Sequence, residues 1–145
     1  MARMIDVSSK GEVLRVARAR GCIRLRRETI DRIRRGEVEK GDVATVSKIV
    51  AIEGAKRAHQ LLPFCHPIRI DHVEPSIEVL DDRVCVEVVV KARERTGVEM
   101  EALTAVSLAL LNVWDMVKKY EKDELGQYPH TEIVSVRVLE KVKKE

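Results

Sequence analysis

The segment covering residues 97–120 constrains the fold most, because its apolar residues recur at the spacing of an amphipathic helix. These residues are Met100, Leu103, Val106, Leu110, Trp114 and Val117. Gly126 and Pro129 mark the place where the chain leaves this segment. The sequence therefore predicts one long helix over about residues 97–120.

Two further segments have an equally clear period. Residues 17–26 alternate between small or apolar residues and a face with four arginines, which is typical of a half-buried strand. The segment "GDVATVSKIVAIEGAKRAHQLL" (residues 41–62) indicates a second long helix, with Asp42 as its N-cap and Pro63 ending it. Small residues on several sides of this helix indicate close packing against more than one neighbour.

The remaining elements are shorter. We expect strands at 4–8 ("MIDVS"), 68–80, 83–91 and 131–142, and a short helix at 27–35 that Gly36 stops. The order is then β-β-α-α-β-β-α-β. It predicts a single α+β domain over residues 1–145, a ferredoxin-like sandwich whose largely antiparallel sheet has helices packed on one face.

Composition narrows the class of protein. The chain has 145 residues, 45% hydrophobic and 35% charged, with only 3% aromatic, so its core must be aliphatic. The net charge of +3 is mild and compatible with an anionic small molecule. No apolar run reaches the roughly 20 residues of a membrane span, and no signal peptide is visible. We expect no membrane association and a cytoplasmic location.

Cysteine and amide usage add two expectations. Three cysteines (Cys22, Cys65 and Cys85) without C-x-x-C spacing indicate neither a disulfide framework nor a zinc site, so we expect no metal. The scarcity of Asn and Gln beside abundant Lys, Arg and Glu resembles the composition of thermophile proteins.

The acidic residues in "RTGVEMEALTA" have two interpretations. Thr96 and Glu99 have the spacing of a capping box, and Glu101 lies in the first helical turn, where the helix dipole favours a carboxylate. Alternatively, the same acids line an active site.

The segment "LLPFCHP" (residues 61–67) is a candidate for chemistry. Pro63 and Pro67 stiffen the chain around His66, whose side-chain type titrates near neutrality. His66 is then either a satisfied loop histidine or a positioned acid, base or substrate contact. Cys65 is better explained as a small buried apolar residue than as a nucleophile.

Charged residues elsewhere leave further alternatives. Asp115 and Lys118, three residues apart, form either an exposed helical ion pair or a proton-exchanging pair in a cleft. Lys40 precedes a helix N-terminus and could complete an anion site there. The arginine face of strand 17–26 is either solvated or a binding surface for a triphosphate.

The positions of two acidic residues bear on assembly. Glu101 and Asp115 lie 14 residues apart on one predicted helix, a distance of about 21 Å along its axis. One pocket within a single chain cannot easily reach both. If both residues serve one site, that site lies between subunits.

Five motifs together carry a family resemblance: "MIDVSSK", "KGDV", "LLPFCHP", "RTGVEMEALTA" and "VWDMVKK". In this order and at these intervals they resemble molybdenum cofactor biosynthesis protein C, the cyclic pyranopterin monophosphate synthase family, over about residues 4–125. The resemblance implies a lyase that converts a cyclised dihydro-GTP, the product of a radical-SAM GTP cyclase, to cyclic pyranopterin monophosphate with release of diphosphate. It also implies a ferredoxin-like fold and a hexamer, a trimer of dimers, with active sites at subunit interfaces.

The resemblance also assigns residues. Asp115, Lys118, Lys40 and His66 match catalytic positions of the family. Substrate contacts fall on Phe64, Cys65, His66, Glu99, Met100 and Glu101, and we expect no cofactor. The division of proton transfers among the four catalytic residues stays open.

The chain departs from the family pattern in two places. Arg95 stands where many members have lysine, which keeps the positive charge. Many members end in a Gly-rich tail with a functional lysine, whereas this chain ends "VLEKVKKE", and whether Lys141 or a neighbour replaces that lysine stays open.

The alternative to an enzyme is a binding module. Ferredoxin-like sheets with a basic strand can also form RNA- or nucleotide-binding regulatory modules. Such modules stack bases on sheet aromatics, which this chain nearly lacks, so we expect no nucleic-acid partner.

Overall fold

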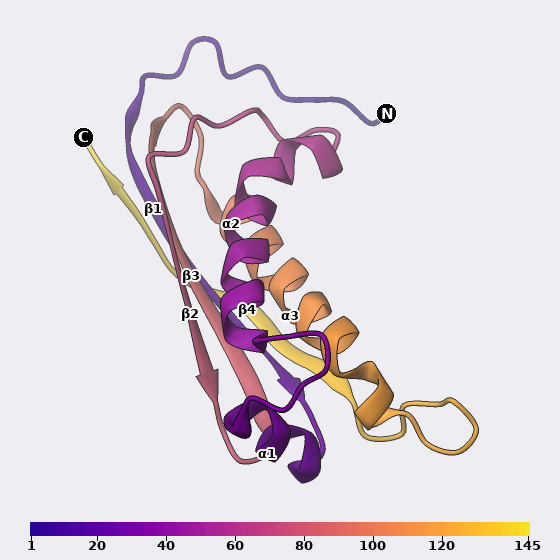
Figure 1. The fold of residues 1–145 in the computed structure, drawn as a ribbon. Helices are drawn as coiled ribbons and strands as arrows, with labels where there is room; N and C mark the ends of the chain where they lie inside the picture. The colour runs from indigo at the N-terminus through magenta and orange to yellow at the C-terminus, as the bar shows by residue number, and fades with distance from the viewer.

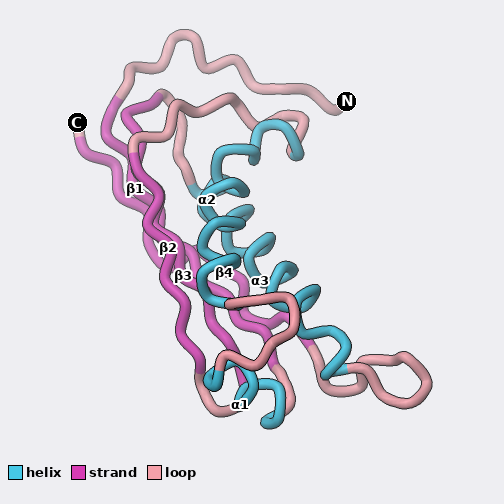
Figure 2. Tube along the Cα trace, viewed as in Figure 1, coloured by secondary structure: helices cyan, strands magenta, loops and turns pink.

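The computed structural model describes residues 1–145 and contains seven regular elements (Figure 1). In chain order they are β1 (Val13–Arg24), α1 (Arg27–Arg35), α2 (Val43–Leu61), β2 (His72–Val79), β3 (Arg83–Glu94), α3 (Glu99–Glu121) and β4 (Glu132–Lys144). The strands form one antiparallel sheet in the order β2-β3-β1-β4. Figure 2 shows α2 and α3 lying together on one face of this sheet. The predicted α+β, ferredoxin-like class is confirmed, with α1 as an additional short helix of 9 residues after β1.

Alternation along the two central strands explains why the sheet has one apolar face. Ala17, Ala19 and Ile23 of β1 are buried under the helices, together with the even-numbered valines of β3 from Val84 to Val90. Three arginines of β1 lie on the opposite face, where Arg18, Arg20 and Arg24 pair with Glu87, Glu78 and Glu132. These pairs favour the interpretation of that face as a solvated surface.

Small residues allow α2 and α3 to pack closely. A Cβ atom added at Gly54 would lie 3.3 Å from the Cα atom of Ala105, and Ala51, Ala55 and Ala58 are buried along the same helix. This confirms the close packing predicted from the small residues of α2. The two helices run in opposite directions, so the start of α2 lies beside the end of α3, and the end of α2 beside the start of α3 (Figure 1).

Helix α3 is long and apolar enough, by length and composition alone, to cross a bilayer. In this fold it is the central core helix, with Ala105, Val106, Ala109, Leu110 and Val113 fully buried against the sheet and α2. Core helices of this kind pass the same length and composition test.

Three predictions about local structure are wrong. The segment "MIDVS" is not a strand: residues 1–12 have no regular secondary structure and pair with no strand of the sheet. Strand β1 starts at Val13 instead of residue 17. The capping box of α3 does not form either: the N-cap is Val98, whose side chain makes no cap hydrogen bond. By contrast, the predicted N-cap of α2 is confirmed, since Asp42 accepts a hydrogen bond from Thr45 N.

The expectation that the cysteines indicate no disulfide is also wrong. Cys22 and Cys85 form a disulfide, while Cys65 is free. The two bonded residues lie directly opposite each other in the register of β1 and β3. Their separation of 63 residues in the sequence hides this proximity, which only the strand register reveals.

Candidate active site

One cluster of predicted site residues lies where the start of α2 meets the end of α3. The Asp115 carboxylate accepts from Lys118 Nζ at 3.1 Å and from Lys40 Nζ at 3.1 Å, one lysine on each oxygen. Lys40 Nζ also donates to the backbone carbonyl of Asp115 at 3.0 Å. The i, i+3 contact inferred from the sequence is therefore present, and Lys40 joins it from 75 residues away.

The electrostatics of this cluster keep Asp115 ionised. Hydrogen bonds from Lys118 and then Lys40 lower the pKa of Asp115 below its usual range. The three side chains are about half exposed, and they border a pocket of about 220 Å³ together with Glu39, Met116 and Lys119. Lys119 is held by an ion pair with Glu39. The pocket thus presents three ammonium groups and two carboxylates: Asp115 holds Lys40 and Lys118, and Glu39 holds Lys119.

A second cluster lies at the other end of α3. Glu101 is only 2% exposed, and its Oε2 accepts a hydrogen bond from Cys65 Sγ at 3.5 Å. Its other oxygen, Oε1, is buried without a partner. Burial raises the pKa of Glu101, because the charged form loses hydration that the protein does not replace.

The free thiol beside it is not activated. Burial, followed by the charge of Glu101, raises the pKa of Cys65 to about 11, so the thiol stays protonated at neutral pH. A thiol needs to ionise to attack. This agrees with the interpretation of Cys65 as a packing or contact residue rather than a nucleophile.

The other residues of this end differ in exposure. Glu99 folds back over Gly97, where any side chain would collide with its carboxylate, and it pairs with Lys141 Nζ at 3.3 Å. Its Oε2 is buried and unpartnered. Phe64 and Met100 are 49% and 40% exposed, which is unusual for large apolar side chains beside buried acids.

His66 faces a segment that sequence reasoning did not connect with it. Its Nε2 atom lies 2.5 Å from the backbone oxygen of Ile5. Lys141 was considered from the sequence as a substitute for the family's tail lysine, but its contact with Glu99, across 42 residues between β4 and α3, was not predicted. No local sequence signal indicates either contact, since both depend on how distant segments pack.

The two clusters do not meet within one chain. Glu101 and Asp115 lie 14 residues apart on α3, about 21 Å along the helix axis. The two clusters therefore lie near opposite ends of α3, which Figure 1 shows at opposite ends of the molecule. Lys40, Asp115 and Lys118 lie together at one end, and the residues from Phe64 to His66 with Glu99 to Glu101 lie at the other.

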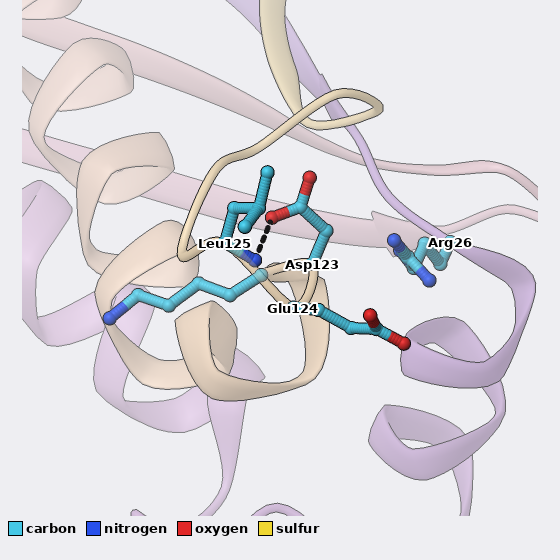
Figure 3. Close-up of a pocket in the computed structure, with 5 residues that line it drawn as sticks. Arg26, Asp123, Glu124 and Leu125 are labelled. Carbon is cyan, nitrogen blue, oxygen red and sulfur yellow. Dashed lines mark hydrogen bonds between the residues drawn. The ribbon is translucent and has the colours of Figure 1, made fainter.

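A third hollow, of about 500 Å³, lies beside the loop after α3. In Figure 3, Arg26 lies on one side of it and the labelled loop residues on the other, while Asp123 turns back to accept the Leu125 N–H. Its charged groups do not converge on a common point. This hollow is therefore not the candidate site.

Comparison with known proteins gives a consistent result. The family model described as the MoaC family matches residues 4–144. A protein of Sulfurisphaera tokodaii named probable cyclic pyranopterin monophosphate synthase is 56% identical over 142 residues, which is 98% of this chain and 94% of that protein. A protein of the same name from Sulfolobus acidocaldarius is 55% identical over 140 residues, 97% of this chain and 98% of that one.

A third relative carries a slightly different name. The protein of Methanothermobacter thermautotrophicus is called probable cyclic pyranopterin monophosphate synthase accessory protein, and it is 48% identical over 143 residues, 99% of this chain and 90% of its own length. The match of the family model extends over nearly the whole chain, and the relatives match at about half of their positions. The chain belongs to the MoaC family.

Proposed function

We propose that this protein is a cyclic pyranopterin monophosphate synthase of molybdenum cofactor biosynthesis. It converts 3′,8-cyclo-7,8-dihydroguanosine 5′-triphosphate to cyclic pyranopterin monophosphate and releases diphosphate. The observation that carries the proposal is the Lys40–Asp115–Lys118 cluster, whose exposed ammonium groups are fixed at a pocket. Membership of the MoaC family supplies the reaction.

The chemistry needs the groups that this cluster offers. Rearranging the purine-derived ring moves protons on and off nitrogen, a task for Lys118, which the ion pair with Asp115 holds in position. Closing the cyclic phosphate makes a substrate hydroxyl attack the α-phosphorus while diphosphate leaves. Lys40 stabilises the negative charge that develops on the leaving group.

The second cluster contributes substrate contacts. The unpartnered oxygens of Glu99 and Glu101 are acceptors without a donor in the free chain, and the substrate's ring carries N–H donors. Phe64 and Met100 supply apolar contact surface, with Cys65 and His66 beside them. His66 takes part in proton transfer.

The two clusters form one site only when two chains combine. We therefore propose a homo-oligomer, a hexamer built as a trimer of dimers, with each active site shared between subunits. The exposed apolar residues Phe64, Met100, Ile49 and Leu111 support this, because an isolated chain would leave them in water.

The proposed substrate also implies an upstream enzyme and a cellular location. It is supplied by a radical-SAM GTP cyclase, to which we propose a functional link, and the site of action is the cytoplasm. RNA binding is not favoured: no strand of the sheet carries a Phe, Tyr or Trp, and Arg18, Arg20 and Arg24 of β1 are paired with glutamates.

The decisive experiment is turnover of the cyclised intermediate. Purified protein is incubated with it, and the pyranopterin product is followed by mass spectrometry while diphosphate is measured with a coupled enzyme. Asp115→Asn should abolish product formation. Asp31→Asn is the matched control, because Asp31 forms an exposed helical ion pair with Arg27 on α1. Equal loss in both variants, or no product from the unmodified protein, would exclude the proposal.

A further inference from the structure

The N-terminal segment, residues 1–12, has no regular secondary structure and contains no buried residue. It passes across the end of the molecule at which α2 finishes (Figure 1). One hydrogen bond joins it to the rest of the chain, between His66 Nε2 and the backbone oxygen of Ile5. The position of the segment therefore depends on this histidine.

The chemistry of this contact determines where the proton of His66 resides. A backbone carbonyl can only accept a hydrogen bond, so Nε2 of the imidazole must donate it. In the neutral ring this leaves the lone pair on Nδ1. A hydrogen bond at one ring nitrogen thus determines which nitrogen can act as a base.

The segment also brings a charge to the same place. Asp6 follows Ile5 and accepts a hydrogen bond from Ser8 N at 2.8 Å, which shapes the segment into a turn. This hydrogen bond, with a smaller contribution from the charge of His66, lowers the pKa of Asp6 and keeps it ionised. Asp6, His66 and Arg95 border one open hollow of about 410 Å³ together with residues 4, 5, 7 and 8.

We propose that residues 4–8 form a positioning strap for His66: the Ile5 carbonyl holds the proton on Nε2, so that Nδ1 is the atom that exchanges a proton with the substrate. The catalytic part of this inference rests on the proposed function. When Nδ1 takes a proton from the substrate, the ring becomes an imidazolium that keeps its Nε2–H bond to Ile5, and the Asp6 carboxylate balances the new charge. The strap itself touches no reacting atom.

The tautomer can be measured directly. Long-range ¹H–¹⁵N correlation spectra of the full chain, labelled at histidine, distinguish Nε2–H from Nδ1–H rings. His66 is assigned from its absence in His66→Gln, and His59, which makes no hydrogen bond, is the internal reference. We expect neutral His66 as the Nε2–H tautomer alone. A mixture like that of His59, or a proton on Nδ1, would overturn the proposal.

Two substitutions separate the roles of the two nitrogens. In His66→Gln the side-chain amide places an N–H donor near the position of Nε2, so the contact with Ile5 is retained. In His66→Asn the amide is too short to reach it. Trypsin cleavage after Lys10 should be slow in the unmodified protein and in His66→Gln, and faster in His66→Asn. Equal cleavage rates in all three proteins would show that His66 does not hold the strap.

Turnover tests the catalytic consequence. A chain with Asp6→Gly and Ser8→Gly loses the turn and should lower kcat about tenfold or more with KM unchanged, as loss of partners that fix imidazole tautomers does. Ser9→Gly adds a glycine to the same segment without removing the turn and is the control. An unchanged kcat in the double variant would refute the positioning role. If the unmodified protein forms no product, the proposed function fails, while the spectra and the trypsin assay still decide whether the strap holds His66.

Discussion

Glu101 and Glu121 are two buried glutamates on the same helix, and their surroundings predict opposite effects of the same substitution. Glu101 has one oxygen without a partner, and burial raises its pKa. Glu121 is fully buried but accepts hydrogen bonds from the Thr29 and Thr131 hydroxyls and from the backbone N–H of Arg26. Replacing each by glutamine removes the charge and nearly preserves the volume.

Glu101→Gln should stabilise the folded protein at neutral pH. A buried unpaired polar group costs about 1–3 kcal/mol, and an ionised one costs more. The amide of the glutamine still leaves one polar atom unpaired. The gain is therefore only the difference in free-energy cost between burying an unpaired charged group and burying an unpaired neutral one, on the order of 1 kcal/mol. For a chain of this length this corresponds to a melting temperature higher by about 3 °C. Glu121→Gln should lower the free energy of unfolding by about 1–3 kcal/mol, because the amide nitrogen cannot accept from the donors around it.

The pH dependence of Glu101→Gln follows from the direction of the pKa shift. Because the folded state binds the proton of Glu101 more tightly than the unfolded state, the stability of the unmodified protein falls as pH rises above the ordinary value of 4.5. The fall ends once pH exceeds the raised pKa. The glutamine variant lacks this loss, so its advantage should vanish at low pH, where Glu101 is neutral in both states.

The measurement is thermal unfolding by circular dichroism across this pH range at fixed protein concentration. A lower melting temperature of Glu101→Gln at neutral pH would refute the reasoning, because it would mean that the ionised carboxylate has stabilising partners. An advantage that is equally large at all pH values would refute it as well. Under the proposed function, Glu101→Gln should at the same time lose turnover, because it removes a carboxylate that contacts the substrate. Residues placed for function often cost stability in this way.

Three further predictions concern the disulfide and the candidate site. Replacing Cys22 and Cys85 together by serine should lower the free energy of unfolding by about 4 kcal/mol, from the entropy of closing a loop between residues 63 positions apart, and the melting temperature by on the order of 10 °C; unchanged melting would contradict the disulfide. Mixing Asp115→Ala chains with Glu101→Ala chains should restore part of the activity that each lacks alone, and light scattering that finds an active monomer would exclude shared sites. Lys118→Ala and Asp115→Asn should each abolish most product formation, with the double variant little worse than either, whereas multiplicative losses would show that the two residues act independently.

Sequence periodicity predicted the parts of this fold that depend on local order. The alternation in residues 17–26 identified β1, and the helical spacing from Met100 to Val117 identified α3. Each pattern arises because one face of the element is buried against the core. The contact of Asp115 with Lys118 was predictable for the same reason, since residues three apart on a helix are neighbours.

Contacts between distant segments were not predictable in this way. The disulfide depends on the register of β1 against β3, and the pairing of Lys40 with Asp115 depends on the antiparallel packing of α2 on α3. The capping box at Thr96 was a reasonable prediction from spacing, but Glu99 folds back over Gly97 and pairs with Lys141, and the helix starts at Glu99 with Val98 as its N-cap. The strand predicted at residues 4–8 is wrong because a strand forms only by pairing with a neighbour, and this segment pairs with none, although β2 and β4 each have a free edge.

The packing of α2 on α3 links the two halves of the candidate site. At Gly54 an added Cβ would lie 3.1 Å from Leu108 Cδ1 and 3.3 Å from Ala105 Cα, so the two helices are as close as their backbones permit. This spacing fixes Lys40 against Asp115 at one end of the pair and Cys65 against Glu101 at the other. A rigid pair of helices therefore carries one group of reactive side chains at each end, and neither group needs the other in order to form. Such an element suits a shared site, because each half is already in place before two chains meet.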